Sequence, residues 1–169
     1  MASIVVYYSR KGENYWTGGV KNISKGNTER VAEFVAEATD ADLFELETVE
    51  EYPKDYYECT DVAKRELQEH ARPALKAVPD VSGYDTIFLG YPIWWGTMPM
   101  CVYTFLENAD LAGKTIRPFA TSEGSGLGSS VREVAKTAKG TTVEEGFYVA
   151  GHDAASSKDK AVAWAKQFQ

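Results

Sequence analysis

Three segments of the chain combine residue types that suit the binding of a phosphate beside a flat ring. The first is formed by Ser9 and Arg10 together with Gly26, Asn27 and Thr28, at the start of an expected helix. A helix N-terminus presents unpaired N–H groups and about half a positive charge, so it attracts phosphate. The hydroxyls of Ser9 and Thr28 and the guanidinium of Arg10 add further donors. An ordinary N-cap in a strand-to-helix loop explains the same residues equally well.

The second segment follows a strongly apolar run and contains two adjacent tryptophans. Successive side chains of an extended chain point to opposite sides, so both indoles cannot enter one core layer. Prolines and a glycine shape the backbone here, which favours a loop that holds the edge of a flat ligand. A purely structural aromatic plug is the alternative. The candidate binding residues are Pro92, Ile93, Trp94, Trp95 and Gly96.

The third segment is rich in glycine and hydroxyl groups and precedes another expected helix. Its candidate residues are Thr121, Ser122, Glu123, Gly124 and Gly126. Glycine allows the backbone to approach a ligand closely, although a flexible loop has the same composition. The chain contains neither a GxxxxGKS/T loop nor a GxGxxG sequence after its first strand, which excludes these two nucleotide-binding motifs.

The elements that must position these segments alternate along the chain. Short apolar runs predict strands at 4–8, 43–49, 86–90, 115–121 and 143–149, and apolar spacings of three and four predict helices at 28–38, 57–71, 103–107, 131–138 and 158–168. Such alternation is typical of an α/β protein with three layers, in which helices cover both faces of a parallel sheet. Five strands favour the order 2-1-3-4-5, which places all three segments at one rim of the sheet.

With these segments, the sequence resembles the flavodoxin-like family of FMN-binding proteins, and the likeness extends over nearly the whole chain. The run from Pro92 to Pro99, PIWWGTMP, is specific to a bacterial branch of that family. The resemblance implies that FMN is the cofactor and that the first segment holds its phosphate. The second segment would line the ribityl chain and the isoalloxazine, and the third would form the opposite wall.

One departure from the family pattern lies within the phosphate loop, which is usually short and contiguous. Here the residues from Lys11 to Lys25 are interposed. A long loop inside a compact domain is usually functional or mobile. We therefore predict a single domain over residues 1–169 with a loop insertion at about 11–25. We expect this insertion to be a flap that brings Tyr15 or Trp16 close to the flavin.

The composition excludes several other classes of protein. The 169 residues suit one domain, and 18 basic against 25 acidic residues give a net charge of −7, which disfavours nucleic acid and anionic membranes as partners. Cys59 and Cys101 form neither a disulfide framework nor a CxxC metal site. The N-terminus lacks a basic leader, and no apolar run approaches the roughly 20 residues of a membrane span. We expect a cytoplasmic protein without a metal.

Three functions remain open at this point. The first is an electron-transfer flavodoxin, which needs redox protein partners but no catalytic residue. The second is an FMN-dependent NAD(P)H:quinone-type oxidoreductase, which needs a pocket for a small quinone-like acceptor above the ring. The third is an interaction domain without a cofactor. This function is the least favoured of the three, because such a domain does not need three specialised loops at one edge of the sheet.

Overall fold

The computed structural model describes residues 2–168, and its main sheet contains six parallel strands within that range. They are β1 (Ser3–Tyr7), β4 (Asp42–Glu45), β5 (Thr86–Pro92), β6 (Thr115–Ser122), β7 (Thr142–Val143) and β8 (Phe147–Ala150). The spatial order is β4-β1-β5-β6, and β7 and β8 both pair with the far side of β6. Because β7 and β8 share the fifth position, the predicted order 2-1-3-4-5 is confirmed.

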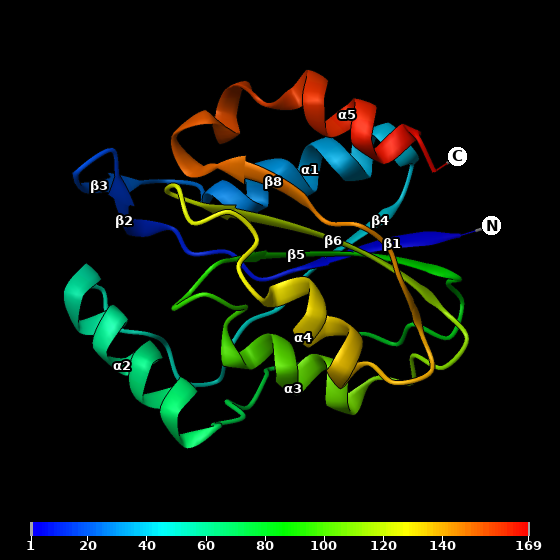
Figure 1. Ribbon diagram of the computed structural model, residues 1–169, viewed down its shortest axis with the longest axis horizontal. Helices are drawn as coiled ribbons and strands as arrows, with labels where there is room; N and C mark the ends of the chain where they lie inside the picture. The colour runs from blue at the N-terminus through cyan, green and yellow to red at the C-terminus, as the bar shows by residue number, and fades with distance from the viewer. Residues whose placement is uncertain (1, 169) are drawn as a thin grey trace.

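Helices cover both faces of this sheet (Figure 1). On one side lie α1 (Asn27–Thr39) and α5 (Lys158–Lys166), and on the other lie α3 (Met100–Asn108) and α4 (Ser130–Thr137). Alternate side chains of β1 enter the two apolar cores, since Val6 belongs to one cluster and Val5 to the other. Within residues 2–168, no helix is both long and apolar enough to cross a membrane.

The carboxyl ends of β1, β5 and β6 meet at one edge of the sheet, because the three strands are parallel neighbours. Figure 1 shows α2 (Tyr56–Glu69) beside this edge, together with a small hairpin formed by β2 (Gly12–Trp16) and β3 (Gly19–Ile23). A short 3-10 helix, η1 (Gly151–Ser156), follows β8 at the same edge. This edge, called the rim below, therefore gathers segments from distant parts of the sequence.

The insertion predicted at about 11–25 forms the β2–β3 hairpin. Five residue pairs join its antiparallel strands, from Gly12 opposite Ile23 to Trp16 opposite Gly19. The two turn residues, Thr17 and Gly18, have φ values of 43° and 96°. Two positive φ values in a two-residue loop are typical of the turns whose twist matches a hairpin. The insertion is thus a regular element and holds its side chains in a defined direction.

The prediction of one continuous strand over 143–149 is wrong. The chain pairs with β6 as β7, leaves the ladder over residues 144–146, and returns as β8. The gap faces Arg117 and Pro118, which have no partner in β7 or β8. Because proline lacks an N–H group, it cannot donate to a neighbouring strand, and the ladder is interrupted beside it.

The strand predicted at 43–49 is shorter in the structure. Regular pairing with β1 ends at Glu45, and the chain beyond it makes one isolated antiparallel bridge between Thr48 and Leu75. The predicted helices agree with α1 to α5 within a few residues at each end. Differences of this size are expected, since sequence patterns locate the middle of an element better than its ends.

Candidate functional site

The start of α1 is formed by a close approach of two backbone segments. Gly26 occupies the N-cap and makes no side-chain hydrogen bond to the helix start. Ser9 Oγ supplies the missing acceptor, because the N–H of Glu29 donates to it at 3.0 Å. A Cβ at position 26 would overlap Ser9 Oγ and lie 2.9 Å from the carbonyl oxygen of Arg10. The N-terminus of α1 is therefore packed directly against the end of β1.

Two backbone donors remain at this helix start. Asn27 and Thr28 are the first residues of α1, so their N–H groups have no acceptor inside the helix. Thr28 is buried, and its hydroxyl lies 2.8 Å from that of Thr121 at the end of β6. The helix dipole and these two donors make the site electropositive. The structure thus brings Asn27, Thr28 and Thr121 together, and their role in holding a phosphate stays a prediction.

Arg10 lies next to the predicted seat, but its guanidinium is directed elsewhere. Its Nε donates to the carbonyl of Glu13 at 2.9 Å, and its Nη2 donates to the carbonyls of Pro53 and Lys54, each at 3.0 Å. These bonds tie the base of the hairpin to the segment that precedes α2. In this structure Arg10 positions the hairpin, and its side chain does not face the start of α1.

A cavity of about 200 Å³, the rim cavity, opens at the carboxyl ends of β5 and β6. It brings together residues from all three predicted segments, namely Asn27, Pro92, Ile93, Trp94, Thr121, Ser122 and Glu123. Tyr15 of the insertion, which was expected near the ligand, also lines it, and the sequence reasoning missed four further lining residues: Asn14, Tyr56, Ser125 and Gly151. The hairpin residues could be suspected from the insertion, but no local pattern singles out Tyr56 or Gly151.

The other predicted residues lie around this cavity without lining it. Ser9, Gly26 and Thr28 build the start of α1, as described above. Gly124 donates its N–H to the hydroxyl of Tyr148 at 3.0 Å, and Gly126 lies in the same loop. Trp95 and Gly96 form the tip of a tight turn in which Trp94 and Thr97 exchange backbone hydrogen bonds. The predicted set therefore divides into a phosphate seat, a ring of lining residues and supporting turns.

The two tryptophans point in different directions, as the sequence predicts. Trp94 packs edge-on against Tyr8 and Tyr52, with ring centroids 5.5 and 5.0 Å apart. Trp95 is half exposed, and its indole N–H donates to the carbonyl of Thr60 in α2 at 3.0 Å. Its φ of 54° is unusual for a bulky residue. Strain of this kind persists only where the surroundings impose it, and it occurs most often at functional sites.

Glu123 links the third segment to the tip of the hairpin. Its Oε1 accepts the N–H of Thr17 at 3.2 Å, and its Oε2 lies 2.6 Å from Nδ1 of His152 in η1. The Glu123 side chain is only 11% exposed, so both partners are well placed to satisfy it. On its other side, Nε2 of His152 lies 3.6 Å from the carboxylate of Asp153. The hairpin is therefore fastened across the rim cavity, as expected of a flap.

The hydrogen bond to Glu123 raises the pKa of His152 above its usual value of 6.5. A raised folded-state pKa means that this bond stabilises the protein fully below the unfolded pKa and that the contribution disappears as pH rises through the folded pKa. We expect the urea midpoint of the wild type to fall more between pH 6 and pH 9 than that of His152→Gln. His70→Asn, at an exposed histidine outside this cluster, should keep the wild-type pH dependence. Equal falls in the wild type and His152→Gln would contradict the assignment.

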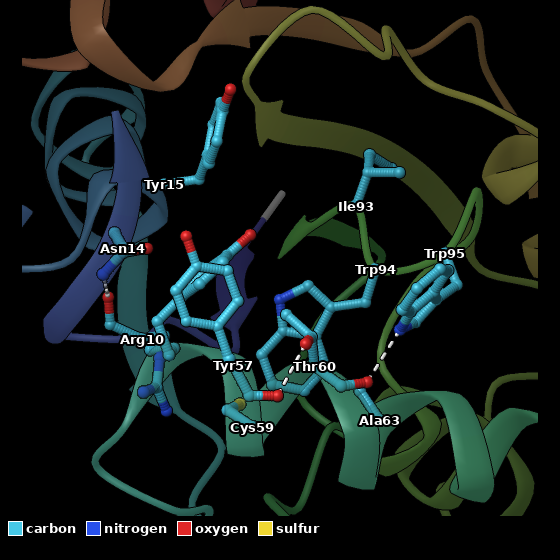
Figure 2. Close-up of a pocket in the computed structure, with 11 residues that line it drawn as sticks. Arg10, Asn14, Tyr15, Tyr57, Cys59, Thr60, Ala63, Ile93, Trp94 and Trp95 are labelled. Carbon is cyan, nitrogen blue, oxygen red and sulfur yellow. Dashed lines mark hydrogen bonds between the residues drawn. The ribbon is translucent and has the colours of Figure 1, made fainter. Parts of the chain in front are cut away.

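A second cavity, the aromatic cavity, adjoins the first and has a volume of about 420 Å³ (Figure 2). It shares Asn14, Tyr15, Tyr56, Ile93 and Trp94 with the rim cavity. Its remaining lining residues are Arg10, Tyr57, Cys59, Thr60, Ala63 and Trp95. Burial raises the pKa of the Cys59 thiol, so this cysteine stays protonated and is a poor nucleophile.

Comparison with known proteins places this arrangement in context. The sequence profile of the flavodoxin family matches residues 20–168. A candidate flavoprotein from Bacteroides uniformis is 30% identical, with a TM-score of 0.80 over 98% of this chain and 97% of the other. A second, from Bacteroides eggerthii, is also 30% identical, with a TM-score of 0.78 over 98% and 96%. No curated protein matches the chain.

A third solved structure contains a bound cofactor. It is a flavoprotein from Lactobacillus acidophilus in complex with FMN, and it is 24% identical to this chain. The match covers 94% of this chain and 97% of that one, with a TM-score of 0.66. At this level of identity the likeness establishes a common fold.

Proposed function

Since the chain belongs to the flavodoxin family, we propose that it binds FMN at the rim and transfers electrons through the bound flavin. The observation that carries this proposal is the convergence of three strand-end segments on one cavity, next to the N-terminus of α1, which its N-cap residue does not cap with a side chain. The proposal also draws on the family membership and on the FMN that the Lactobacillus acidophilus flavoprotein binds. FMN supplies the redox chemistry, and the protein binds and orients it.

The residues at the start of α1 fit a phosphate. The absence of a side chain at Gly26 lets the start of α1 pack closely against Ser9, where a Cβ would otherwise overlap the Ser9 hydroxyl. The N–H groups of Asn27 and Thr28 and the hydroxyl of Thr28 lie at this point, and a helix N-terminus favours negative charge. The carboxylate of Glu123, at the end of the neighbouring strand, is engaged by the Thr17 N–H and by His152.

The walls of the rim cavity fit a planar ring system. The segment from Pro92 to Trp94 lies beside the segment from Thr121 to Glu123, because β5 and β6 are paired, and Tyr15 lines the cavity from the hairpin. Aromatic contact with a ring system adds about 0.5–1.5 kcal/mol beyond the burial of area. The hairpin limits access of water to the site, and Glu123 holds it in place.

Electron transfer to a partner protein is the first candidate role. Such a carrier needs an accessible flavin edge and a surface for transient docking, but it needs no catalytic base. The exposed carboxylates of Glu45, Glu47, Glu50 and Glu51 lie at the end of β4 and in the segment after it, and the chain has a net charge of −7. An acidic surface suits a basic redox partner, and its on-rate would fall as salt is added.

Binding of FMN is the direct test of this proposal. Purified protein mixed with FMN and then separated from free flavin by gel filtration should be yellow, and calorimetry should give one site per chain with a Kd in the micromolar range or below. Riboflavin, which lacks the phosphate, should bind more weakly by about tenfold or more, because a charge-assisted contact contributes about 1.5–3 kcal/mol. A protein that remains colourless, or that binds both flavins equally, would refute the site.

The aromatic cavity favours a second candidate function, an FMN-dependent reductase of small quinone-like acceptors. A second pocket beside the flavin is not needed for transfer to a protein partner. Stopped-flow mixing of the FMN-loaded protein with NADPH or NADH distinguishes the two roles. Rapid reduction by the nicotinamide favours the reductase, whereas accumulation of the one-electron-reduced flavin on photoreduction favours the carrier.

A further inference from the structure

The turn over residues 94–97 joins β5 to α3 and brings Trp94 into the walls of both cavities. Trp94 and Thr97 exchange two backbone hydrogen bonds across it, of 2.8 and 3.3 Å. Between them, Trp95 and Gly96 have φ values of 54° and 84°. Because a positive φ is costly for a bulky residue, the turn keeps this shape only where its surroundings impose it.

The tip of the turn is tethered on two sides. The Trp95 indole donates to the carbonyl of Thr60 in α2. The carbonyl of Gly96 accepts two hydrogen bonds from Ser129 at the N-cap of α4, one from the N–H at 2.8 Å and one from the hydroxyl at 3.2 Å. Gly128 permits this approach, since a Cβ there would overlap the Gly96 carbonyl oxygen. These contacts leave the end of the turn to a third tether.

The third tether is a chain of hydroxyl groups that begins at the end of the turn. The Thr97 hydroxyl lies 3.1 Å from the hydroxyl of Tyr103 in α3, and Tyr103 donates to Oε1 of Glu133 in α4 at 2.9 Å. A tyrosine hydroxyl has one proton, which Tyr103 gives to the carboxylate, so Thr97 must be the donor to Tyr103. Thr97 and Tyr103 are only 5% and 6% exposed, so this relay is buried.

The Tyr103 ring is held in place from outside the relay. Figure 1 shows α3 and α4 together on one face of the sheet, which sets Tyr103 beside Glu133. The Arg72 guanidinium lies 4.8 Å from the centroid of the Tyr103 ring, and its Nε donates to Glu107 at 2.8 Å. Burial is the main cause that raises the pKa of Tyr103 to about 12, so its hydroxyl keeps its proton at neutral pH.

The relay lies behind the turn. Among the residues that the structure describes, neither Thr97 nor Tyr103 lines the rim cavity or the aromatic cavity. A buried and fully paired set of hydrogen bonds selects one arrangement of the groups that it joins. Any effect of this relay on a ligand must therefore pass through the turn and through the Trp94 side chain that the turn presents.

We propose that Tyr103 is a positioning residue for the flavin, which holds the turn over residues 94–97, through Thr97, in the shape that lines both cavities. This inference rests on the proposed function and makes α3 and α4 determinants of flavin affinity. Without the relay, fewer chains hold the strained turn ready before FMN arrives. The apparent affinity falls with that fraction.

Two single changes break the bond at the centre of the relay. Thr97→Val removes one hydroxyl and keeps the branched shape, and Tyr103→Phe removes the other. Each should weaken FMN binding about threefold, which corresponds to about 0.7 kcal/mol at 1.4 kcal/mol per tenfold. Riboflavin binding should weaken by the same factor, because the turn acts on the ring system. Thr97→Ser, which keeps the hydroxyl, should bind FMN as the wild type does.

The double variant Thr97→Val/Tyr103→Phe shows whether the two hydroxyls act together. Since either change breaks the same bond, the double variant should also lose about threefold, whereas independent effects would multiply to about ninefold. Tyr84→Phe is the matched control. It removes a hydroxyl that donates to the Asp42 carboxylate just before β5, at the opposite edge of the sheet, and it should leave the FMN Kd unchanged.

Amide hydrogen exchange, followed by NMR in FMN-free protein, measures the turn directly. The N–H groups of Trp94 and Thr97 close the turn, so their exchange should become at least about threefold faster in both single variants, with little change in the amides of β1. A contribution to overall stability alone would speed exchange in β1 equally and would leave the Kd of the folded variants unchanged.

The outcomes separate this proposal from the proposed function. Unchanged FMN affinity in both single variants, a ninefold loss in the double variant, or a loss that riboflavin does not share would overturn the role of Tyr103, even if the wild type binds FMN. If the wild type binds no FMN but the turn amides exchange faster in the variants, the proposed function fails, and the hold of Tyr103 on the turn is supported.

Discussion

Replacing Gly26 with alanine should weaken FMN binding by about tenfold or more, equivalent to about 1.4 kcal/mol. The added Cβ would overlap Ser9 Oγ and lie 2.9 Å from the carbonyl oxygen of Arg10. Ser9 could rotate away only by giving up the hydrogen bond from Glu29, and the Arg10 carbonyl belongs to the backbone and cannot rotate. The start of α1 must therefore move away from β1, and the phosphate donors move with it.

The affinity can be measured by calorimetry or by quenching of FMN fluorescence. Overpacking of this kind also destabilises the fold by about 1–3 kcal/mol, so urea unfolding of the FMN-free variant must be recorded in parallel. Gly83→Ala is the control, because no atom lies within 4 Å of a Cβ at that position. A folded Gly26→Ala protein with wild-type FMN affinity would show that the phosphate does not bind at the start of α1.

Shortening the hairpin should have a comparable effect on FMN affinity and should also shift the redox potential. Gly12 and Ile23 lie opposite each other, and facing Cα atoms in antiparallel strands are only about 4.5–5.5 Å apart. Two glycines can therefore replace residues 13–22. The variant loses Asn14 and Tyr15 from both cavities, and it loses the contact between Thr17 and Glu123. Water then reaches the flavin more freely, which weakens every polar contact at the site.

The main sheet should survive this change, because the hairpin forms a separate two-stranded sheet. The urea midpoint of the FMN-free variant should accordingly stay close to that of the wild type. Thr17→Asn is the matched control, since asparagine tolerates the positive φ of this turn position and leaves the hairpin intact. If FMN affinity and potential are unchanged when the hairpin is shortened, the hairpin has no role as a flap.

Local patterns were sufficient to predict the sheet and most of its rim. Continuous apolar runs such as Ile4 to Tyr8 are required of strands buried on both faces, and their alternation with helical spacings implies parallel pairing. The order of the strands then follows from right-handed crossovers, and the carboxyl ends of the strands define the ligand edge. For this reason the sequence alone places Asn27, Trp94 and Glu123 at one edge of the sheet, where they line one cavity.

Three features depend on tertiary contacts that no local sequence pattern predicts. The guanidinium of Arg10 turns to the carbonyls near residue 54, because the folded chain brings that segment within reach. Tyr56 and Gly151 reach the rim cavity from α2 and η1, which no short-range periodicity connects to it. The pairing of Glu123 with His152 and Thr17 likewise joins three distant segments.

By itself, the sequence determined the parallel α/β sheet, the edge at which the three candidate segments meet and the start of α1 at that edge, because these depend on hydrophobic periodicity and helix termini. The tertiary structure alone decided that the insertion is a fastened hairpin and that an aromatic cavity lies beneath it. Periodicity reports which face of an element is buried, but the partners of individual side chains depend on packing between elements remote in the chain.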